Sequence, residues 1–146
     1  MQVVPDVTPL TAPYWEGARE GRLMLQHCLS CGECWHPPEH ICPNCQSSDI
    51  EWRPAAGTGV VYSYTVVSHA THMAFDGKTP YLVALVDLEE GPRLVTSIRN
   101  CAHTDAYVDM PVTVVFETVG EITLPQFVPS PSEKKPVYSK FSSETP

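Results

Sequence analysis

The segment CLSCGECWHPPEHICPNC, from Cys28 to Cys45, holds five of the six cysteines of this 146-residue chain. It contains two CxxC pairs, Cys28 with Cys31 and Cys42 with Cys45. A CxxC pair presents two thiolates from one tight turn, and two facing pairs complete a tetrahedral site of four sulfur atoms that suits zinc. The spacing therefore predicts a zinc ribbon with Cys28, Cys31, Cys42 and Cys45 as the metal ligands.

The fifth cysteine of the segment, Cys34, leaves the ligand set partly open. The run CxxCxxC that it completes also occurs in iron–sulfur ligation, so Cys34 can replace a ligand or remain free. Two matched thiol pairs favour a metal over a redox-active thiol pair. Three histidines are alternative ligands, although paired thiols outrank them: His27, His36 and His40.

A site with four thiolates has a closed coordination shell. A catalytic zinc keeps one position open for water or substrate, so this arrangement predicts a structural metal instead. Such a metal forms a small core where apolar residues are few. Any chemistry has to be sought elsewhere in the chain.

The composition excludes several classes of protein. The formal charge is −8 with only nine Lys plus Arg, whereas a nucleic-acid-binding protein usually has a basic patch. The 15 prolines make a helical bundle improbable. No secretory signal and no apolar run of about 18 residues are apparent. We therefore expect a soluble cytoplasmic protein without a membrane partner, a setting in which clustered cysteines favour metal over disulfides.

Short elements rich in β-branched and aromatic residues follow the cysteine segment. A short helix is predicted first, over Pro13–Met24, with Pro13 in its first turn. Because no helical pattern separates the strands, a closed five-stranded Greek-key barrel of the OB type fits best, and Pro125 predicts an edge position for the last strand. The predicted strands are Gly57–His69, Tyr81–Leu88, Arg93–Asn100, Val112–Val119 and Ile122–Pro129.

These elements predict a mainly β protein in four parts. Residues 1–26 form an N-terminal segment and helix, 27–53 the zinc ribbon, 54–129 the OB-fold barrel, and 130–146 a flexible polar tail. Within the tail, Tyr138 and Phe141 can dock when a ligand or partner arrives.

The search for catalytic residues finds no convincing constellation. No GxSxG, HExxH, P-loop or GxGxxG motif is present. His69 can act as a general base and Cys101, close to His103, as a thiol nucleophile. A free-standing hydrolase using these residues is one hypothesis, but their isolation argues against it.

The order of motifs resembles the DUF35 family, whose members pair a rubredoxin-like zinc ribbon with an OB-fold. The resemblance covers roughly residues 13–129 and rests on YWEGAREGRLMLQ, CxxCG, HPPEHICPNC, GTGVVYSYTVV and PYLVALVDL, in that order. It implies a non-catalytic accessory subunit of a thiolase-like or other acyl-CoA enzyme. Such a subunit binds or channels a CoA thioester and completes the partner's active site for thiolytic or retro-aldol chemistry.

The resemblance also implies roles for particular residues. The four cysteines match the family's metal ligands, with Cys34 as a departure from the commonest pattern. The end of the first strand and the following loop, Ser68–Pro80, correspond to a ligand-binding face, so Val67, Ser68, Phe75 and Tyr81 are the expected contacts of the CoA thioester.

The remaining expectations concern the contacts with the partner enzyme and the charge needed to bind CoA. Tyr14 and Trp15 are the expected contacts with the enzyme, as exposed aromatic residues of a short helix. CoA is polyanionic and the chain is acidic, so the positive charge comes either from the partner or from local cations of this chain: Lys78, Arg93, Arg99 and the pair Lys134–Lys135. The competing hypothesis is a nucleic-acid-binding module, since OB-folds and zinc ribbons often serve that purpose.

Overall fold

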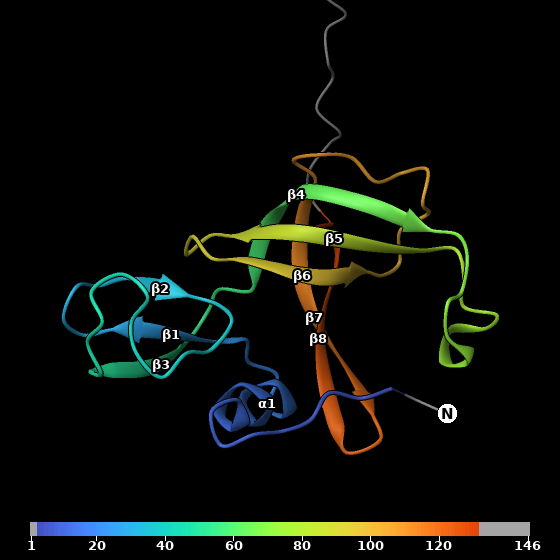
Figure 1. The fold of residues 1–146 in the computed structure, drawn as a ribbon. Coiled ribbons are helices and arrows are strands. Elements are labelled where there is room, and N and C mark those ends of the chain that lie inside the picture. The colour runs from blue at the N-terminus through green and yellow to red at the C-terminus, as the bar shows by residue number, and fades with distance from the viewer. Residues whose placement is uncertain (1–2, 132–146) are drawn as a thin grey trace, which may run out of the picture.

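The computed structural model describes residues 3–131, which form an N-terminal helix, a small ribbon and a barrel. Figure 1 shows the ribbon on one side of the barrel, with the helix α1 below both and close to the strands β7 and β8. No helix within residues 3–131 is long and apolar enough to span a membrane. The expected docking residues Tyr138 and Phe141, like Lys134–Lys135, lie outside the described residues.

The helix α1 spans Ala12–Arg19 and is shorter than its sequence pattern indicates. The chain turns at Gly21, whose φ is 76°, and the backbone N–H of Arg22 donates to the carbonyl of Gly17. A glycine in this left-handed conformation after the last turn is a common helix stop. The predicted helix end at Met24 is therefore wrong, because Met24 already begins a strand.

The ribbon is a three-stranded antiparallel sheet in the order β2–β1–β3. The strands are β1 (Met24–Cys28), β2 (Cys34–Trp35) and β3 (Ile50–Pro54). Its own buried cluster is small and consists of Cys28, Trp35 and Cys42 with Ile50 packed against them. Because two of these residues are cysteines of the CxxC pairs, metal ligation has to supply much of what a larger apolar core would supply.

Five strands close into a barrel in the order β4–β5–β6–β8–β7. All neighbours pair antiparallel except β6 and β8, which meet in parallel at one residue pair, Ile98 with Phe127. This confirms the mainly β class and the OB-fold barrel. The strands are β4 (Thr58–Val67), β5 (Tyr81–Leu88), β6 (Arg93–Ile98), β7 (Pro111–Val119) and β8 (Ile122–Pro129).

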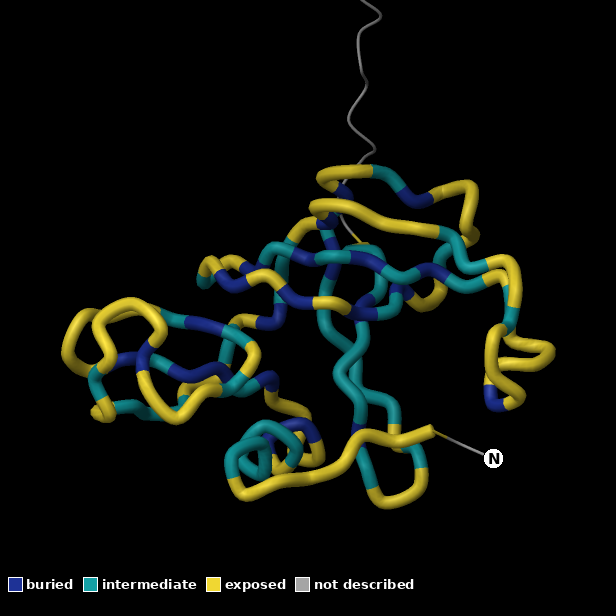
Figure 2. The backbone as a smooth tube through the Cα atoms, in the orientation of Figure 1, coloured by how far each residue is buried: buried dark blue, intermediate teal, exposed yellow. Residues whose placement is uncertain are grey.

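The core lies inside the barrel and extends toward the ribbon. Along β5, buried residues alternate with partly exposed ones, so that one side of the strand faces the core (Figure 2). Leu23 and Leu25, which precede and lie within β1, belong to the same buried cluster as barrel residues such as Val86 and Phe127. The ribbon is thus anchored to the barrel by its first strand.

The strand β8 has edge character over part of its length. It pairs with β7 from end to end, with Pro125 opposite Phe116, but reaches β6 only at Phe127. Pro125 therefore lies where the β6 side of the strand is unpaired, as its missing N–H requires. After β8, the backbone N–H of Ser130 donates to the carbonyl of Pro111 at 2.9 Å, so the barrel holds the first residue of the predicted tail.

Candidate metal centre and ligand pocket

The four cysteines of the two CxxC pairs converge at the end of the ribbon. Their sulfur atoms all lie within 4.8 Å of one another. The closest approaches join the two pairs: Cys28 Sγ to Cys45 Sγ is 3.5 Å, and Cys31 Sγ to Cys42 Sγ is 3.6 Å. Four sulfur donors converging on one point are the donor set that zinc prefers in structural sites.

The local backbone favours the thiolate form of the first pair. The N–H of Cys31 points at Cys28 Sγ over 3.5 Å and lowers the pKa of the Cys28 thiol to about 6. The pKa of Cys31 is also lowered, first by the backbone N–H of Glu33 and then by the side-chain amide of Asn44. Since the thiolate is the form that ligates a metal, these hydrogen bonds favour ligation by Cys28 and Cys31.

Cys34 and the histidines stand apart from this cluster. Cys34 lies in β2 opposite His27, outside the four-sulfur group. Burial, followed by the carboxylates of Glu90 and Glu33, raises the pKa of its thiol to about 11. Within residues 3–131, the group that can hold a metal includes neither His36 nor His40.

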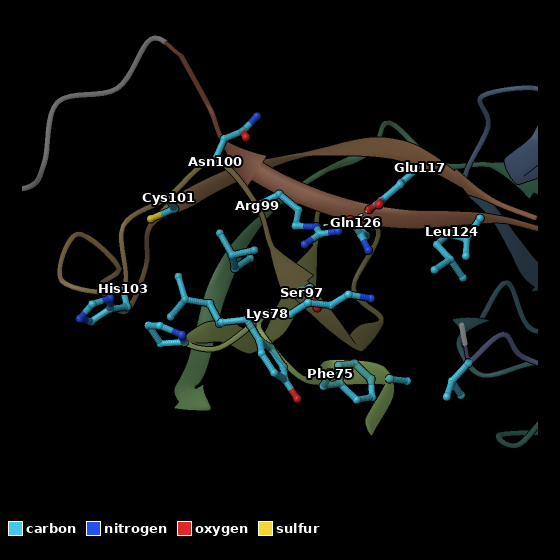
Figure 3. Close-up of a pocket in the computed structure, with 17 residues that line it drawn as sticks. Phe75, Lys78, Ser97, Arg99, Asn100, Cys101, His103, Glu117, Leu124 and Gln126 are labelled. Atoms are coloured by element: carbon cyan, nitrogen blue, oxygen red, sulfur yellow. Dashed lines mark hydrogen bonds and ion pairs between the residues drawn. The ribbon is translucent and has the colours of Figure 1, made fainter. Parts of the chain in front are cut away.

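A pocket of about 330 Å³ lies beside the seam where β6 and β8 separate. We call it the seam pocket. In Figure 3, Arg99, Glu117 and Gln126 gather on one side of the hollow and Phe75 lies on the other. OB-folds commonly bind ligands on the second and third strands, here β5 and β6, and on the adjacent loops. The lining residues are Val3, Ala74, Phe75, Lys78, Pro80, Tyr81, Leu82, Ser97, Ile98, Arg99, Asn100, Cys101, His103, Glu117, Val119, Leu124 and Gln126.

The polar wall of the seam pocket is organised around Arg99, directly after β6. Its Nη2 donates to Glu117 Oε2 at 2.6 Å and its Nε to Gln126 Oε1 at 2.7 Å. Its backbone N–H also donates to the carbonyl of Phe127 at 2.7 Å. The guanidinium is thus held in one orientation by residues of β7 and β8, although all three side chains remain open to solvent.

The structure brings together two of the four expected ligand contacts. The rings of Phe75 and Tyr81 are stacked, with centroids 5.7 Å apart and planes inclined by 24°, and both line the pocket. Phe75 closes the short 3₁₀ helix η1 (Met73–Phe75) in the loop after β4. Val67 pairs with Tyr81 in the sheet, but neither Val67 nor Ser68 is a lining residue.

Sequence reasoning missed the contribution of β6 and β8 to this pocket. Ser97 and Gln126 lie on outward-facing positions of their strands, next to the buried Ile98 and Phe127. The alternation of each strand indicates that they face outward. The two faces flank one hollow because β6 and β8 pair at a single residue pair and then separate. Alternation within each strand does not reveal this arrangement.

The residues considered for a free-standing hydrolase do not form a catalytic pair. Cys101 is half-buried, and burial followed by the charge of Asp105 raises the pKa of its thiol. Its Sγ–H donates to the carbonyl of Ala102 at 3.4 Å. His103 lies beside it on the pocket rim, whereas His69 is not a lining residue. A thiol with a raised pKa is a poor nucleophile.

The two aromatic residues of α1 are less exposed than expected. Tyr14 and Trp15 are half-buried and pack edge to face, with centroids 4.9 Å apart. Tyr14 also contacts the ring of His36 at 5.2 Å, and burial raises its pKa to about 12. Trp15 instead lines a shallow groove between α1 and the β7–β8 turn, which includes Glu121.

Fold and metal centre together define a two-module protein, a zinc ribbon followed by an OB-fold. Two family models match these modules, "ChsH2, rubredoxin-like zinc ribbon domain" over residues 15–51 and "ChsH2, C-terminal OB-fold domain" over residues 52–117. A DUF35 domain-containing scaffold protein of Methanocaldococcus jannaschii is 37% identical over 109 residues, covering 73% of this chain and 77% of that protein. The chain belongs to the DUF35 family.

Two further relatives are associated with enzymes by name. A probable enoyl-CoA hydratase alpha subunit of Thermomonospora curvata is 43% identical over 127 residues, covering 86% of this chain. This chain spans only 39% of that relative's length. The solved structure titled "Ltp2-ChsH2(DUF35) aldolase" contains a chain with a TM-score of 0.79 and 43% identity, covering 86% of this chain and 98% of that one.

Proposed function

We propose that this chain is a non-catalytic accessory subunit of an acyl-CoA enzyme, as the family resemblance implies. The observation that carries the proposal is the match to a chain of the aldolase structure, at 43% identity over 98% of that chain. Two hydratase alpha subunits, named in Thermomonospora curvata and Mycobacterium tuberculosis, support an association with CoA chemistry. The partner is a thiolase-like enzyme that cleaves or forms a carbon–carbon bond by a thiolytic or retro-aldol reaction.

The seam pocket is the proposed binding place of the CoA thioester. It combines the stacked pair Phe75 and Tyr81 with the cations Lys78 and Arg99, so that it offers both a flat apolar surface and positive charge. Val67 and Ser68 stay proposed contacts of the ligand at the start of the segment that leads to Phe75, although neither is a lining residue of the pocket. The thioester chemistry is left to the partner enzyme, because Cys101 lacks an activated thiol.

The four-cysteine cluster is the proposed site of a structural zinc ion. Cys28, Cys31, Cys42 and Cys45 would hold the ion, and four thiolates leave no open position for substrate. The zinc would keep the ribbon folded against the barrel. Cys34 and the three nearby histidines take no part in ligation.

The test is affinity purification of the tagged chain from its native cells, followed by mass spectrometry. We expect a stoichiometric acyl-CoA enzyme to accompany the chain and to lose activity when the chain is removed. Recovery of the chain alone contradicts the subunit proposal, and recovery with nucleic acid favours the competing binding-module hypothesis. A partner that is fully active without the chain contradicts the role in completing the active site.

A further inference from the structure

The distribution of positive charge singles out one side chain. Four of the cations in residues 3–131 form ion pairs with carboxylates: Arg22 with Glu20, Arg53 with Glu51, Arg93 with Asp87, and Arg99 with Glu117. Among the residues that the structure describes, the remaining cations, Arg19 and Lys78, have no ion pair. Of these two, only Lys78 lines the seam pocket.

The opposite wall adds a second cation with unused donors. The Arg99 guanidinium donates one hydrogen bond to Glu117 and one to Gln126. A guanidinium has five N–H donors, so three remain for a ligand. Among the lysine, arginine and carboxylate side chains that line this pocket, Lys78 and Arg99 are positive and only Glu117 is negative. These charges sum to +1 in a chain whose formal charge is −8. Such a local excess suits an anionic group.

The floor of the pocket is aromatic and flat. Phe75 and Tyr81 stack almost parallel, and Phe75 is 37% exposed. A planar base can extend such a stack, and base–aromatic stacking accepts any base because each has a π-face. Ser97 and Asn100 supply hydrogen-bonding groups on the β6 side of the same hollow.

The size of the pocket limits what it can hold. Pockets that enclose a drug-sized molecule begin at roughly 300 Å³, and the seam pocket is about 330 Å³. A CoA thioester is larger than a drug-sized molecule, so only part of it fits. Its acyl and pantetheine parts carry no charge, whereas its nucleotide end carries an adenine ring and phosphate groups.

We infer that the seam pocket binds the nucleotide end of CoA, with adenine on the Phe75–Tyr81 stack and a phosphate group between Lys78 and Arg99. The inference rests on the proposed function. It places the pantetheine arm and the acyl group outside the pocket, directed toward the partner enzyme. The chain therefore recognises what all CoA thioesters share and leaves acyl selectivity to its partner.

Isothermal titration of the full chain with three probes tests this inference: CoA, adenosine 3′,5′-bisphosphate and pantetheine. We expect CoA and the bisphosphate to bind and to compete, and pantetheine to displace neither. Lys78→Met should raise the Kd for CoA about tenfold or more, the loss of one charge-assisted hydrogen bond. Lys78→Arg should restore most of the affinity.

The matched control is Arg19→Met, which removes the other cation of residues 3–131 without an ion pair, from an exposed helix position outside the seam pocket. Its affinity for CoA should stay within twofold of the parent chain. If CoA binds but pantetheine displaces it, or Lys78→Met binds as tightly as the parent, the inference is overturned and CoA binding stands. If neither the chain nor its purified complex binds CoA, the proposed ligand itself is wrong.

Discussion

Glu90 accepts a hydrogen bond from the backbone N–H of Ala56, with its Oε2 2.8 Å from the nitrogen. The neighbouring carboxylate, Glu89 Oε2, accepts from the hydroxyl of Thr58 at 2.9 Å. Two residues of the β5–β6 turn thus hold the segment that joins the ribbon to the barrel. Both contacts lie at the start of the barrel, directly after the last strand of the ribbon.

Replacement of Glu90 by Ala should loosen this junction. Loss of a hydrogen bond to a partly exposed carboxylate should lower the free energy of unfolding by about 1 kcal/mol. Chemical denaturation monitored by circular dichroism measures the change. Glu90→Gln keeps an acceptor oxygen and should recover most of the loss; equal destabilisation by both variants would show that the hydrogen bond is not the cause.

Replacement of Cys42 by Ser should release the metal and unfold the ribbon. Cys42 is fully buried among the sulfur donors, and structural zinc contributes roughly 10 kcal/mol or more to small zinc modules. Elemental analysis of the purified chain gives the zinc content. Cys34→Ser is the matched control and should retain one zinc, and zinc retained by Cys42→Ser would sink the four-cysteine assignment.

Replacement of Gly59 by Ala should strain the contact between β4 and β5. A Cβ at this position would overlap the backbone oxygen of Asp87, which cannot move aside as a flexible side chain can. Overpacking of this kind costs about 1–3 kcal/mol. Thermal unfolding measures it, with Gly77→Ala as comparison, where the space is open and only the φ of 75° disfavours alanine. A Gly59→Ala chain as stable as the parent refutes the steric argument.

Stability should fall as the pH drops through about 6.5, the ordinary pKa of histidine. Burial lowers the pKa of His36, so the unfolded chain binds a proton in a range where the folded chain does not. The folded state is therefore favoured fully above this range and progressively less below it. Urea denaturation at pH 7.5 and 5.5 measures the slope, which should flatten in His36→Gln but not in His40→Gln, an exposed control.

Replacement of Trp15 by Ala should weaken assembly with the partner enzyme. Trp15 is half-buried and lines the groove between α1 and the β7–β8 turn, where a partner side chain can insert. We expect about a tenfold or greater loss of affinity in a pull-down titration. Val95→Ser, on the outward face of β6 and 70% exposed, serves as control. Undiminished assembly of Trp15→Ala would remove this residue from the interface.

Much of the fold can be predicted from local patterns. Strand β8 follows from its apolar and β-branched residues, and the cysteine cluster of the ribbon follows from CxxC spacing. Both signals depend only on nearby residues. The helix was predicted too long because the apolar residues after Arg19 continue its pattern. Gly21 was the available signal for the helix end, and Leu23 is buried against the barrel rather than on a helix face.

The ligand pocket could be predicted only in part. Phe75 lies in the loop that leads into Tyr81, so sequence proximity brings the two residues together. The Arg99–Glu117 pair joins positions 18 residues apart. It forms because β8 lies between β6 and β7 in the barrel and brings the ends of these two strands close together. Such a contact depends on how the barrel closes, and no hydrophobic periodicity in the sequence indicates it.

The strands β7 and β8 extend past the barrel to meet α1, as Figure 1 shows. Glu117, Leu124 and Gln126 of this hairpin wall the seam pocket, while its turn borders the groove beside Trp15. Glu117 pairs with Leu124 only two residue pairs from Val119 and Ile122 at the turn, so the pocket wall and the groove lie next to each other at the same end of the hairpin. If the proposed enzyme docks beside Trp15, it would contact the same end of the hairpin that walls the seam pocket, so any shift of the hairpin on docking would also move Glu117 and Leu124.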